Sequence, residues 1–189
     1  MYNMKNPIAT MIMNNGNKIK IELYPYEAPN TVNSFIYLAN KGAFDNKDIK
    51  RLVPGFVIQP VYDEFKENED YRYEIDGEFR ENGFNNRLKL EKGVIAMGGD
   101  GKEIASGSCY FITLSDEAGE KLNGKYPGFG RIIEGYEEIE RIEKVETKPV
   151  DIGIEGVIVN KPVVPETIKS VRVEAFSHNY DKPIIKNIV

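Results

Sequence analysis

The sequence predicts a mainly β fold, a closed or nearly closed antiparallel barrel with two helices packed over its open ends. Three observations support this prediction. Short apolar or alternating runs recur along the chain, residues typical of tight turns separate them, and only two segments show the periodicity of a helix. The length of 189 residues suits one domain, and no internal repeat or linker divides the chain.

The first two runs predict a β-hairpin. Residues 18–23 alternate polar and apolar side chains, as the residues of a half-buried strand do. An apolar run over residues 9–13 precedes them, and the Asn15–Gly16 step between the runs suits a tight primed turn.

Two segments far apart in the chain predict helices. The first follows Pro29, where Asn30 or Thr31 can cap it and Gly42 ends it. Its apolar residues recur at i, i+3, i+4 and i+7, namely Val32, Phe35, Ile36 and Ala39. The second helix spans roughly residues 136–144. Its expected buried face consists of Tyr136, Ile139 and Ile142.

The remaining strands are predicted from short runs between and after the helices. Four of these runs cover residues 55–59, 93–97, 108–113 and 128–133. After the second helix we expect a loop over 146–165 and a last strand over 168–175. We assign residues 1–176 to the barrel domain and 177–189 to a C-terminal tail, and the pattern leaves open whether the tail docks or frays.

The net charge and the cysteine content limit which partners and which cellular compartment we expect. The formal net charge of −5 gives nucleic acid or an anionic membrane surface little attraction, so neither is an expected partner. The single cysteine, Cys109, cannot form an internal disulfide, which favours a reducing compartment and hence a cytoplasmic protein. The apolar run at residues 8–13 is a poor signal peptide, and no stretch approaches the ~18 apolar residues of a membrane span.

The chain lacks the side chains on which most catalytic mechanisms depend. Its one histidine, His178, lies in the tail, so a Ser-His-Asp or Cys-His arrangement has no well-placed base, and no Cys/His cluster could bind zinc. The glycine-rich segment 98–102 does not have the spacing of a phosphate-binding loop. We therefore expect no metal and no cofactor, and a reaction that breaks no covalent σ bond.

Three segments resemble the motifs of the cyclophilin family, in the same order. The first is IKRLVPGFVIQ at residues 49–59, which is similar to F-H-R-x-[IV]-P-G-F-x-x-Q. The second is GVIAM at 93–97 followed by SGSCYFI at 106–112, which is similar to G-x-[IL]-x-M-A and then G-S-Q-F-F-I. The third is LNGKYPGFG at 122–130, which is similar to L-D-G-x-[HY]-x-x-F-G. The resemblance extends over about residues 8–175.

The resemblance implies an eight-stranded barrel with two capping α-helices and a peptidyl-prolyl cis–trans isomerase activity. The implied substrates are proline-containing segments of unfolded or partly folded proteins, bound in a shallow groove outside the barrel, and we expect a monomer. By position, the resemblance implies two catalytic residues, Arg51 and Gln59. The substrate-binding residues that it implies are Phe56, Val57, Gly98, Gly99, Cys109, Phe111, Leu122 and Tyr126.

The physics of X–Pro rotation explains these residue types. Amide resonance opposes rotation by ~18–20 kcal/mol, and no base is needed to overcome it. A guanidinium such as that of Arg51 can donate to the proline nitrogen as it pyramidalises, or to the adjoining carbonyl, and so favours the twisted state. Gln59 can anchor a substrate carbonyl and steady Arg51, and the backbone at Gly98 and Gly99 can pair with the peptide. The socket for the proline ring is expected to consist of Phe56, Val57, Phe111 and Leu122.

Two departures from the family pattern keep an alternative open. Cys109 stands where a groove glutamine is usual, and Lys121 stands where many members have tryptophan. Both changes favour a cyclophilin-like module that binds proline-containing peptides, or a holdase, with little turnover, whereas the presence of Arg51 argues against it. A third possibility is an assembly protein whose contact surface is the loop after Glu146 or the tail.

Overall fold

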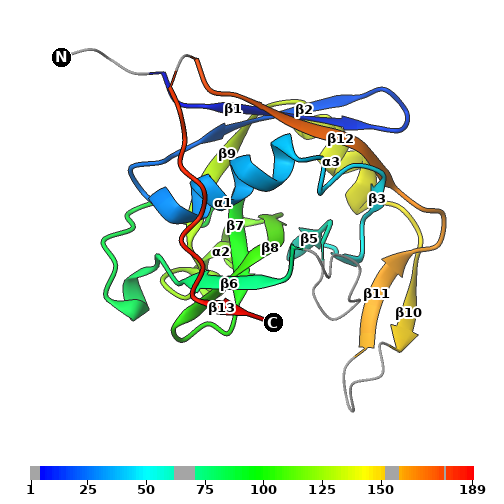
Figure 1. Cartoon of the computed structure of the whole chain (residues 1–189). Helices are drawn as coiled ribbons and strands as arrows, with labels where there is room; N and C mark the ends of the chain where they lie inside the picture. The colour runs from blue at the N-terminus through cyan, green and yellow to red at the C-terminus, as the bar shows by residue number, and fades with distance from the viewer. Residues whose placement is uncertain (1–4, 62–70, 152–157, 177) are drawn as a thin grey trace.

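A strongly curled antiparallel sheet dominates the structure (Figure 1), a computed structural model that describes residues 5–61, 71–151, 158–176 and 178–189. The strands are β1 (Ile8–Met13), β2 (Lys18–Leu23), β3 (Lys47–Asp48), β4 (Arg51–Val53), β5 (Val57–Gln59), β6 (Tyr73–Asp76), β7 (Val94–Gly99), β8 (Ile104–Thr113), β9 (Gly128–Glu134), β10 (Thr147–Asp151), β11 (Ile158–Pro162), β12 (Thr167–Glu174) and β13 (Asn187–Ile188). The helices are α1 (Pro29–Asn40), α2 (Asp116–Leu122), α3 (Tyr136–Glu143) and the short 3₁₀ turn η3 (Arg80–Asn82).

The sheet closes on itself through the segment that contains β3 and β4. Neighbouring strands pair in the order β5-β8-β7-β9-β2-β1-β12-β3, and β4 pairs with β5. Between β3 and β4, the Ile49 amide donates to the Glu166 carbonyl at 2.9 Å, and the Lys50 amide donates to the Gln59 carbonyl at 3.0 Å. If β3 and β4 are counted as one strand, these pairings form a ring of eight, which confirms the predicted barrel.

The interior of the barrel is filled by alternate side chains of its strands. In the first hairpin the buried residues are Ala9, Met11, Met13, Ile19, Ile21 and Leu23, each no more than 2% exposed. The predicted hairpin is therefore confirmed, with its apolar face inward. Helix α1 adds Phe35, whose ring lies 5.2–5.3 Å, centroid to centroid, from the rings of Phe44, Tyr110 and Phe129. Full burial of such side chains stabilises the fold by about 1.5–3 kcal/mol each.

Both predicted helices form, and their apolar faces join the barrel core. Helix α1 starts with Pro29 at its first position, and α3 buries Ile139 and Ile142 in the same core. Ala28 precedes α1 and offers no capping side chain, so a residue distant in the sequence takes that role. The buried carboxylate of Glu78 accepts hydrogen bonds from the amides of Asn30 and Thr31, at 2.9 and 2.8 Å, and from the Thr31 hydroxyl.

The expectation of only two α-helices was wrong, because α2 is a third. The Ser115 hydroxyl caps α2 by accepting a hydrogen bond from the Ala118 amide at 3.0 Å. The helix has seven residues and includes Gly119, so its sequence has little helical periodicity to detect. Gly119 is required there because an added Cβ would lie 1.4 Å from the Leu90 carbonyl oxygen.

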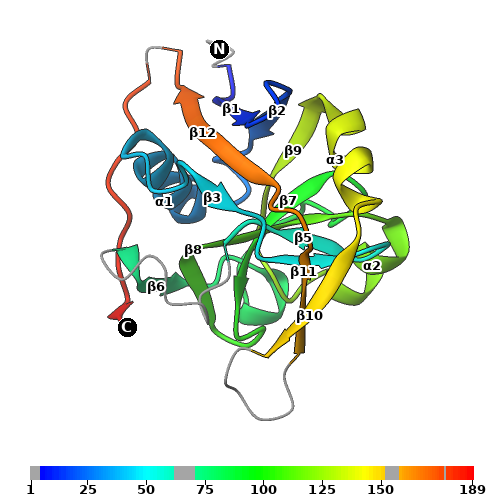
Figure 2. The ribbon, with the colours of Figure 1, turned by 90° about the vertical axis from the view of Figure 1, so that its right-hand side faces the viewer.

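The expected loop over 146–165 instead contains a two-stranded sheet. Strands β10 and β11 pair antiparallel, from Thr147 opposite Pro162 to Asp151 opposite Ile158 (Figure 2). Pro149 and Pro162 both lie in this ladder, and their lack of an amide donor is tolerated because, among the described residues, β10 and β11 pair with no further strand. Proline had suggested a loop at these positions.

The C-terminal tail docks on the body of the protein. In Figure 1 residues 178–189 run past α1 and end beside β6, with which β13 pairs. The tail thus adds an outer strand to the sheet. Among the helices in the described part of the chain, none is long and apolar enough to cross a membrane.

We predict that Glu78→Ala lowers the free energy of unfolding by about 2–3 kcal/mol, because donors at the start of α1 lose their acceptor in a buried place. Urea unfolding followed by circular dichroism measures this change. Glu81→Ala, on an exposed position of the neighbouring 3₁₀ turn, is the matched control and should change stability by less than about 0.5 kcal/mol. Equal stabilities of the two variants would contradict the capping role of Glu78.

A second prediction concerns Asp45 and Arg172, which join the loop after α1 to β12. The Arg172 guanidinium donates to both Asp45 oxygens, at 2.5 and 2.7 Å, and this holds the pKa of Asp45 below its usual value. The stabilisation is therefore complete above the usual aspartate pKa, near pH 4, and is lost as pH falls through the lower folded value. Because Arg172 is half exposed, we expect Asp45→Asn to cost only about 0.5–1 kcal/mol at pH 6.

The same comparison at a pH below the folded pKa of Asp45 should give nearly equal urea midpoints for the wild type and Asp45→Asn, because both side chains are then uncharged. Asp181→Asn, at an exposed tail position, should show no such pH-dependent difference. A cost of Asp45→Asn that persists undiminished at low pH would show that the ion pair is not its cause.

Candidate active site

The groove lies on the outside of the barrel wall, because the same strands present one face to the core and the other to the groove. On β8, Tyr110 and Ile112 belong to the barrel core, whereas Phe111 belongs to a second, smaller apolar cluster. On β7, Ile95 and Met97 point inward in the same way, while Val94 and Ala96 join the outer cluster. This outer cluster supports the groove without opening the core.

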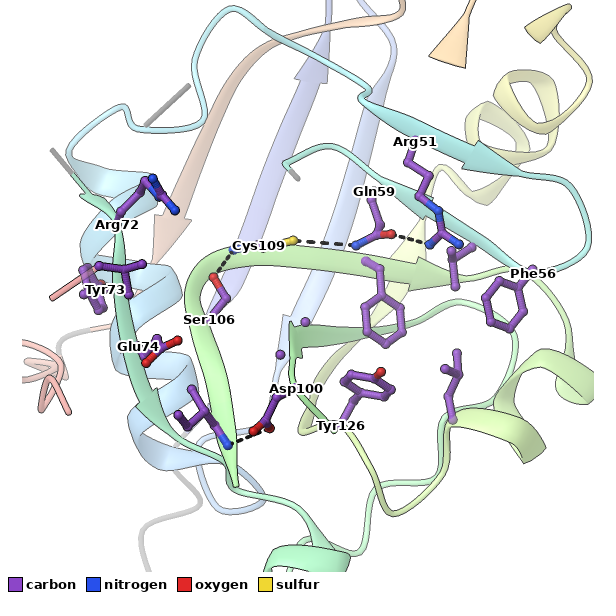
Figure 3. A pocket seen from close by; sticks show the side chains of 17 residues that line it. Arg51, Phe56, Gln59, Arg72, Tyr73, Glu74, Asp100, Ser106, Cys109 and Tyr126 are labelled. Atoms are coloured by element: carbon purple, nitrogen blue, oxygen red, sulfur yellow. Dashed lines mark hydrogen bonds between the residues drawn. The ribbon is translucent and has the colours of Figure 1, made fainter. Parts of the chain in front are cut away.

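The groove has a volume of about 540 Å³. Seventeen residues line it: Arg51, Phe56, Val57, Gln59, Arg72, Tyr73, Glu74, Gly98, Gly99, Asp100, Ile104, Ser106, Cys109, Phe111, Leu122, Tyr126 and Val189. All ten site residues predicted from the sequence are among them. In Figure 3, Arg51, Phe56 and Tyr126 lie toward one side, and Arg72, Tyr73 and Glu74 lie toward the other. We call these two sides the arginine half and the β6 half.

A chain of hydrogen bonds fixes Arg51 in the arginine half. Arg51 and Gln59 face each other across the β4–β5 ladder, and the Arg51 Nη1 donates to Gln59 Oε1 at 2.5 Å. The Gln59 amide nitrogen donates to the Cys109 sulfur at 3.6 Å, and the Cys109 thiol donates to the Val61 carbonyl at 2.9 Å. Gln59 and Cys109 are both buried, so this arrangement orients the Arg51 guanidinium from beneath.

Aromatic and aliphatic side chains form an apolar socket next to Arg51. Phe111 is 4% exposed, and its ring meets the ring of Tyr126 edge to face, with centroids 5.5 Å apart. Val57 lies at the base of the same cluster, and Phe56 and Leu122 are partly buried against it. The Arg51 guanidinium carbon lies 6.0 Å from the centre of the Phe56 ring. A cation therefore borders an apolar recess.

The turn that presents Phe56 is held from two helices. The Gly55 amide donates to a Glu143 carboxylate oxygen of α3 at 2.7 Å. The Gly55 carbonyl accepts from the Ser115 hydroxyl, the same hydroxyl that caps α2, also at 2.7 Å. Gly55 has φ +70°, a conformation that favours glycine. Helix α2, missed in the sequence, therefore positions both Leu122 and the Phe56 turn.

Two glycines bring backbone to the floor of the groove. An added Cβ on Gly99 would lie 2.1 Å from the Ile104 carbonyl oxygen, so no other residue fits without a shift of the backbone. An added Cβ on Gly98 would lie 3.1 Å from the Cys109 carbonyl oxygen, which is also close. A register shift between Met97 and Gly99 interrupts the β7–β8 ladder at this point. Peptide groups rather than side chains are thus presented to a ligand here.

The β6 half was missed in the sequence analysis. It is polar and contains Arg72, Tyr73, Glu74, Asp100, Ile104, Ser106 and Val189. Asp100 belongs to the glycine-rich segment that the sequence pointed out, and it holds its own loop. One carboxylate oxygen accepts from the amides of Lys102, Glu103 and Ile104, and although burial raises the pKa of Asp100, these donors bring it below the usual value. No sequence signal marked Arg72, Glu74 or Val189.

The chemistry available to this groove is hydrogen-bond donation beside an apolar recess. Within the described part of the chain, no group of three or more His, Cys, Asp or Glu residues is arranged to hold a metal ion. The groove offers a fixed guanidinium, an amide and bare backbone, all on rigid strands. Such a site can stabilise a change in the charge or shape of a bound amide without proton abstraction.

Comparisons with known proteins agree with this description. A family profile described as "Cyclophilin type peptidyl-prolyl cis-trans isomerase/CLD" matches residues 8–173. Peptidyl-prolyl cis-trans isomerase B of Bacillus subtilis is 36% identical over 126 residues, which cover 67% of this chain and 83% of that protein. Peptidyl-prolyl cis-trans isomerase-like 2 of Cryptococcus neoformans is 33% identical over 178 residues, covering 82% of this chain but only 28% of the length of that relative.

Solved structures show the same architecture. A cyclophilin type peptidyl-prolyl cis-trans isomerase of Cryptosporidium parvum superposes with a TM-score of 0.69 at 24% identity, over 89% of this chain and 97% of that one. Its structure in the presence of the dipeptide Ala-Pro gives a TM-score of 0.68 at 25% identity, over 88% and 98% of the two chains. These superpositions confirm the mainly β fold.

The buried position of Cys109 leads to a prediction about its reactivity. We expect iodoacetamide to alkylate this thiol at least about 100-fold more slowly in the folded protein than in urea, because it is 5% exposed and donates to Val61. Gln59→Ala removes the amide above the sulfur and should accelerate alkylation several-fold. Mass spectrometry measures the rate without ambiguity, since the chain has one cysteine.

Glu74→Ala is the control, because Glu74 lines the same groove and forms no bond to this chain of contacts. It should leave the alkylation rate unchanged. Equal acceleration by the two variants would mean that the thiol is shielded by the groove in general and not by Gln59.

Proposed function

The chain belongs to the family of cyclophilin-type peptidyl-prolyl cis–trans isomerases, and we propose that its groove accelerates rotation about X–Pro bonds in unfolded or partly folded protein segments. The observation that carries the proposal is the Arg51 guanidinium, fixed by Gln59 at the edge of an apolar socket. Assistance to protein folding follows from this activity, since X–Pro exchange is slow enough to limit folding.

The barrier to be lowered is one of amide resonance. Rotation without a catalyst costs ~18–20 kcal/mol and takes tens to hundreds of seconds. Exchange within milliseconds needs about five orders of magnitude, or about 7 kcal/mol of stabilisation of the twisted state. As the proline nitrogen loses conjugation its lone pair becomes localised on nitrogen, and a donor aimed at that position interacts with the twisted amide more strongly than with either planar form.

Arg51 supplies this donor, and the apolar socket holds the proline ring in place. The proline ring packs on Phe111 among Val57, Phe56 and Leu122, while the part of the chain beyond the bond turns. The Arg51 guanidinium presents a planar fork of N–H groups. Its bond to Gln59 limits its freedom before substrate arrives, so less entropy is lost in the reaction.

Gln59 and the two glycines orient the rest of the peptide. Gln59 holds Arg51 through its oxygen, and it anchors a substrate carbonyl when its amide nitrogen turns from the long contact with Cys109. The backbone at Gly98 and Gly99 pairs with the substrate main chain, which makes binding tolerant of side-chain sequence. We also propose a monomer as the active unit, and size-exclusion chromatography tests this.

We also propose that the protein works in the cytoplasm. The single cysteine is a groove residue and no disulfide stabilises the fold, which suits a reducing compartment. Fluorescent tagging in the source cell tests the location.

Removal of the guanidinium should slow isomerisation while leaving peptide binding largely intact. We predict that Arg51→Ala lowers kcat/KM by about 100-fold, equivalent to about 2.7 kcal/mol of lost stabilisation, and that Arg51→Lys falls between. NMR exchange spectroscopy on a short X–Pro peptide measures the rate. Arg87→Ala, which removes an exposed arginine paired with Glu27, should behave as the wild type.

Two outcomes would contradict this proposal. Wild-type protein that binds the peptide saturably without accelerating exchange would favour the binding module or holdase. If the Arg51→Ala variant still accelerated exchange, the isomerase activity would stand, but Arg51 would not be its catalytic residue.

A further inference from the structure

The tail strand β13 lies beside the end of β6 that borders the groove. The ladder between β6 and β8 pairs Glu74, Ile75 and Asp76 of β6. The ladder with β13 is displaced toward the groove: Ile188 faces Tyr73, and the Val189 amide donates to the Arg72 carbonyl at 3.3 Å. The tail therefore pairs with Tyr73 at the start of β6 and with Arg72 just before it, and both residues line the groove.

Side-chain contacts hold the tail in this register. The Lys186 ammonium lies 2.8 Å from an Asp76 carboxylate oxygen and also contacts Glu103 on the loop before β8, and both carboxylates raise the pKa of Lys186. The Asn187 side-chain nitrogen donates to a Glu74 carboxylate oxygen at 2.8 Å. Lys186 thus ties together the tail, β6 and the loop that closes one end of the β6 half.

A second anchor lies upstream, on the helix. The Asn30 amide nitrogen donates to the Ile184 carbonyl at 2.9 Å, and the Ile184 amide donates to the Asn30 side-chain oxygen at 2.8 Å. Asn30 is at the start of α1, next to the amide groups that Glu78 caps. The tail is therefore fixed at both ends of residues 184–189, and Val189 reaches the groove as a lining residue.

From this arrangement we propose that the tail strand is a specificity element of the isomerase: it positions Arg72 and Glu74 and supplies Val189 as one wall, so that residues flanking the proline bind in the β6 half. The inference rests on the proposed function. Lys186 is a positioning residue, since it acts through β6 and touches no substrate. The arginine half, where the bond turns, is built from other strands and does not depend on the tail.

This division predicts a selective effect of peptide length. A blocked Ala-Pro dipeptide fills only the socket beside Arg51, whereas a peptide extended by three residues on either side also reaches the β6 half. Lys186→Glu places a third acidic group beside Asp76 and Glu103 and should displace the tail. We expect it to raise KM of the extended peptide by about 3- to 10-fold, with kcat within about twofold, and to leave the dipeptide kinetics unchanged.

Two matched variants control the experiment. Lys186→Arg keeps the charge and should retain wild-type KM for both peptides. Lys182→Glu makes the same charge change at an exposed tail position near α1, away from β6, and should also have no effect. Amide hydrogen exchange at Val189, whose amide donates to the Arg72 carbonyl, reports directly whether Lys186→Glu has released the strand.

The outcomes separate the two proposals. If exchange at Val189 is accelerated, three results would each overturn the specificity role: an unchanged KM for the extended peptide, an equal change of KM for both peptides, or a lower KM. If the Val189 amide stayed protected in Lys186→Glu, the claim that this ion pair holds the tail would be wrong. If the wild type accelerated neither peptide, the proposed function would fail, and dissociation constants of the extended peptide for the same variants would still decide the role of the tail.

Discussion

Closure of the barrel requires one stretch of chain to change its hydrogen-bonding partner half-way along. Residues 47–48 pair with β12, and residues 51–53 pair with β5, with the Ile49 and Lys50 amides donating to opposite sides in between. Arg51 is the first residue after this change. Its position opposite Gln59, and so the direction of the guanidinium, is therefore fixed by the same hydrogen bonds that complete the barrel. Fold stability and site geometry share this junction.

Two helices and one strand support the rest of the arginine half, next to this junction. Helix α2 offers Ser115 to the Phe56 turn, α3 offers Glu143, and β8 offers Cys109 to Gln59. The Phe56 turn and the Gln59 side chain are thus each held by further groups. A cysteine in the place of the family's glutamine still accepts a hydrogen bond, so the substitution keeps the support of Gln59 and changes the groove surface.

The sequence predicted the parts of the molecule that depend on local pattern. Alternation in residues 18–23 and helical spacing in 32–39 arise from one face meeting the core, so they can be detected without tertiary information. The ten residues that the motifs predicted for the site all line the groove, because the motifs carry them in order. Helix α2 depends on its Ser115 cap and on close contact with Leu90, and neither feature produces a helical pattern in the sequence. The β10–β11 ladder contains prolines at its edge, and these residues mask the pattern of a strand. The β6 half combines segments more than 100 residues apart, such as Glu74 and Asn187, and only the folded chain brings them together.

The two faces of the barrel wall also bear on how this protein can evolve. On β8 the odd-numbered Cys109 and Phe111 face the groove and the even-numbered Tyr110 and Ile112 face the core, while on β7 the parity is reversed. On these two strands, the residues that contact a ligand and the residues that stabilise the core therefore alternate along the chain and form two separate sets. Point substitutions can diversify the ligand preference of a lineage without eroding its fold, whereas a single-residue deletion within either strand would exchange the two sets and destroy both properties at once.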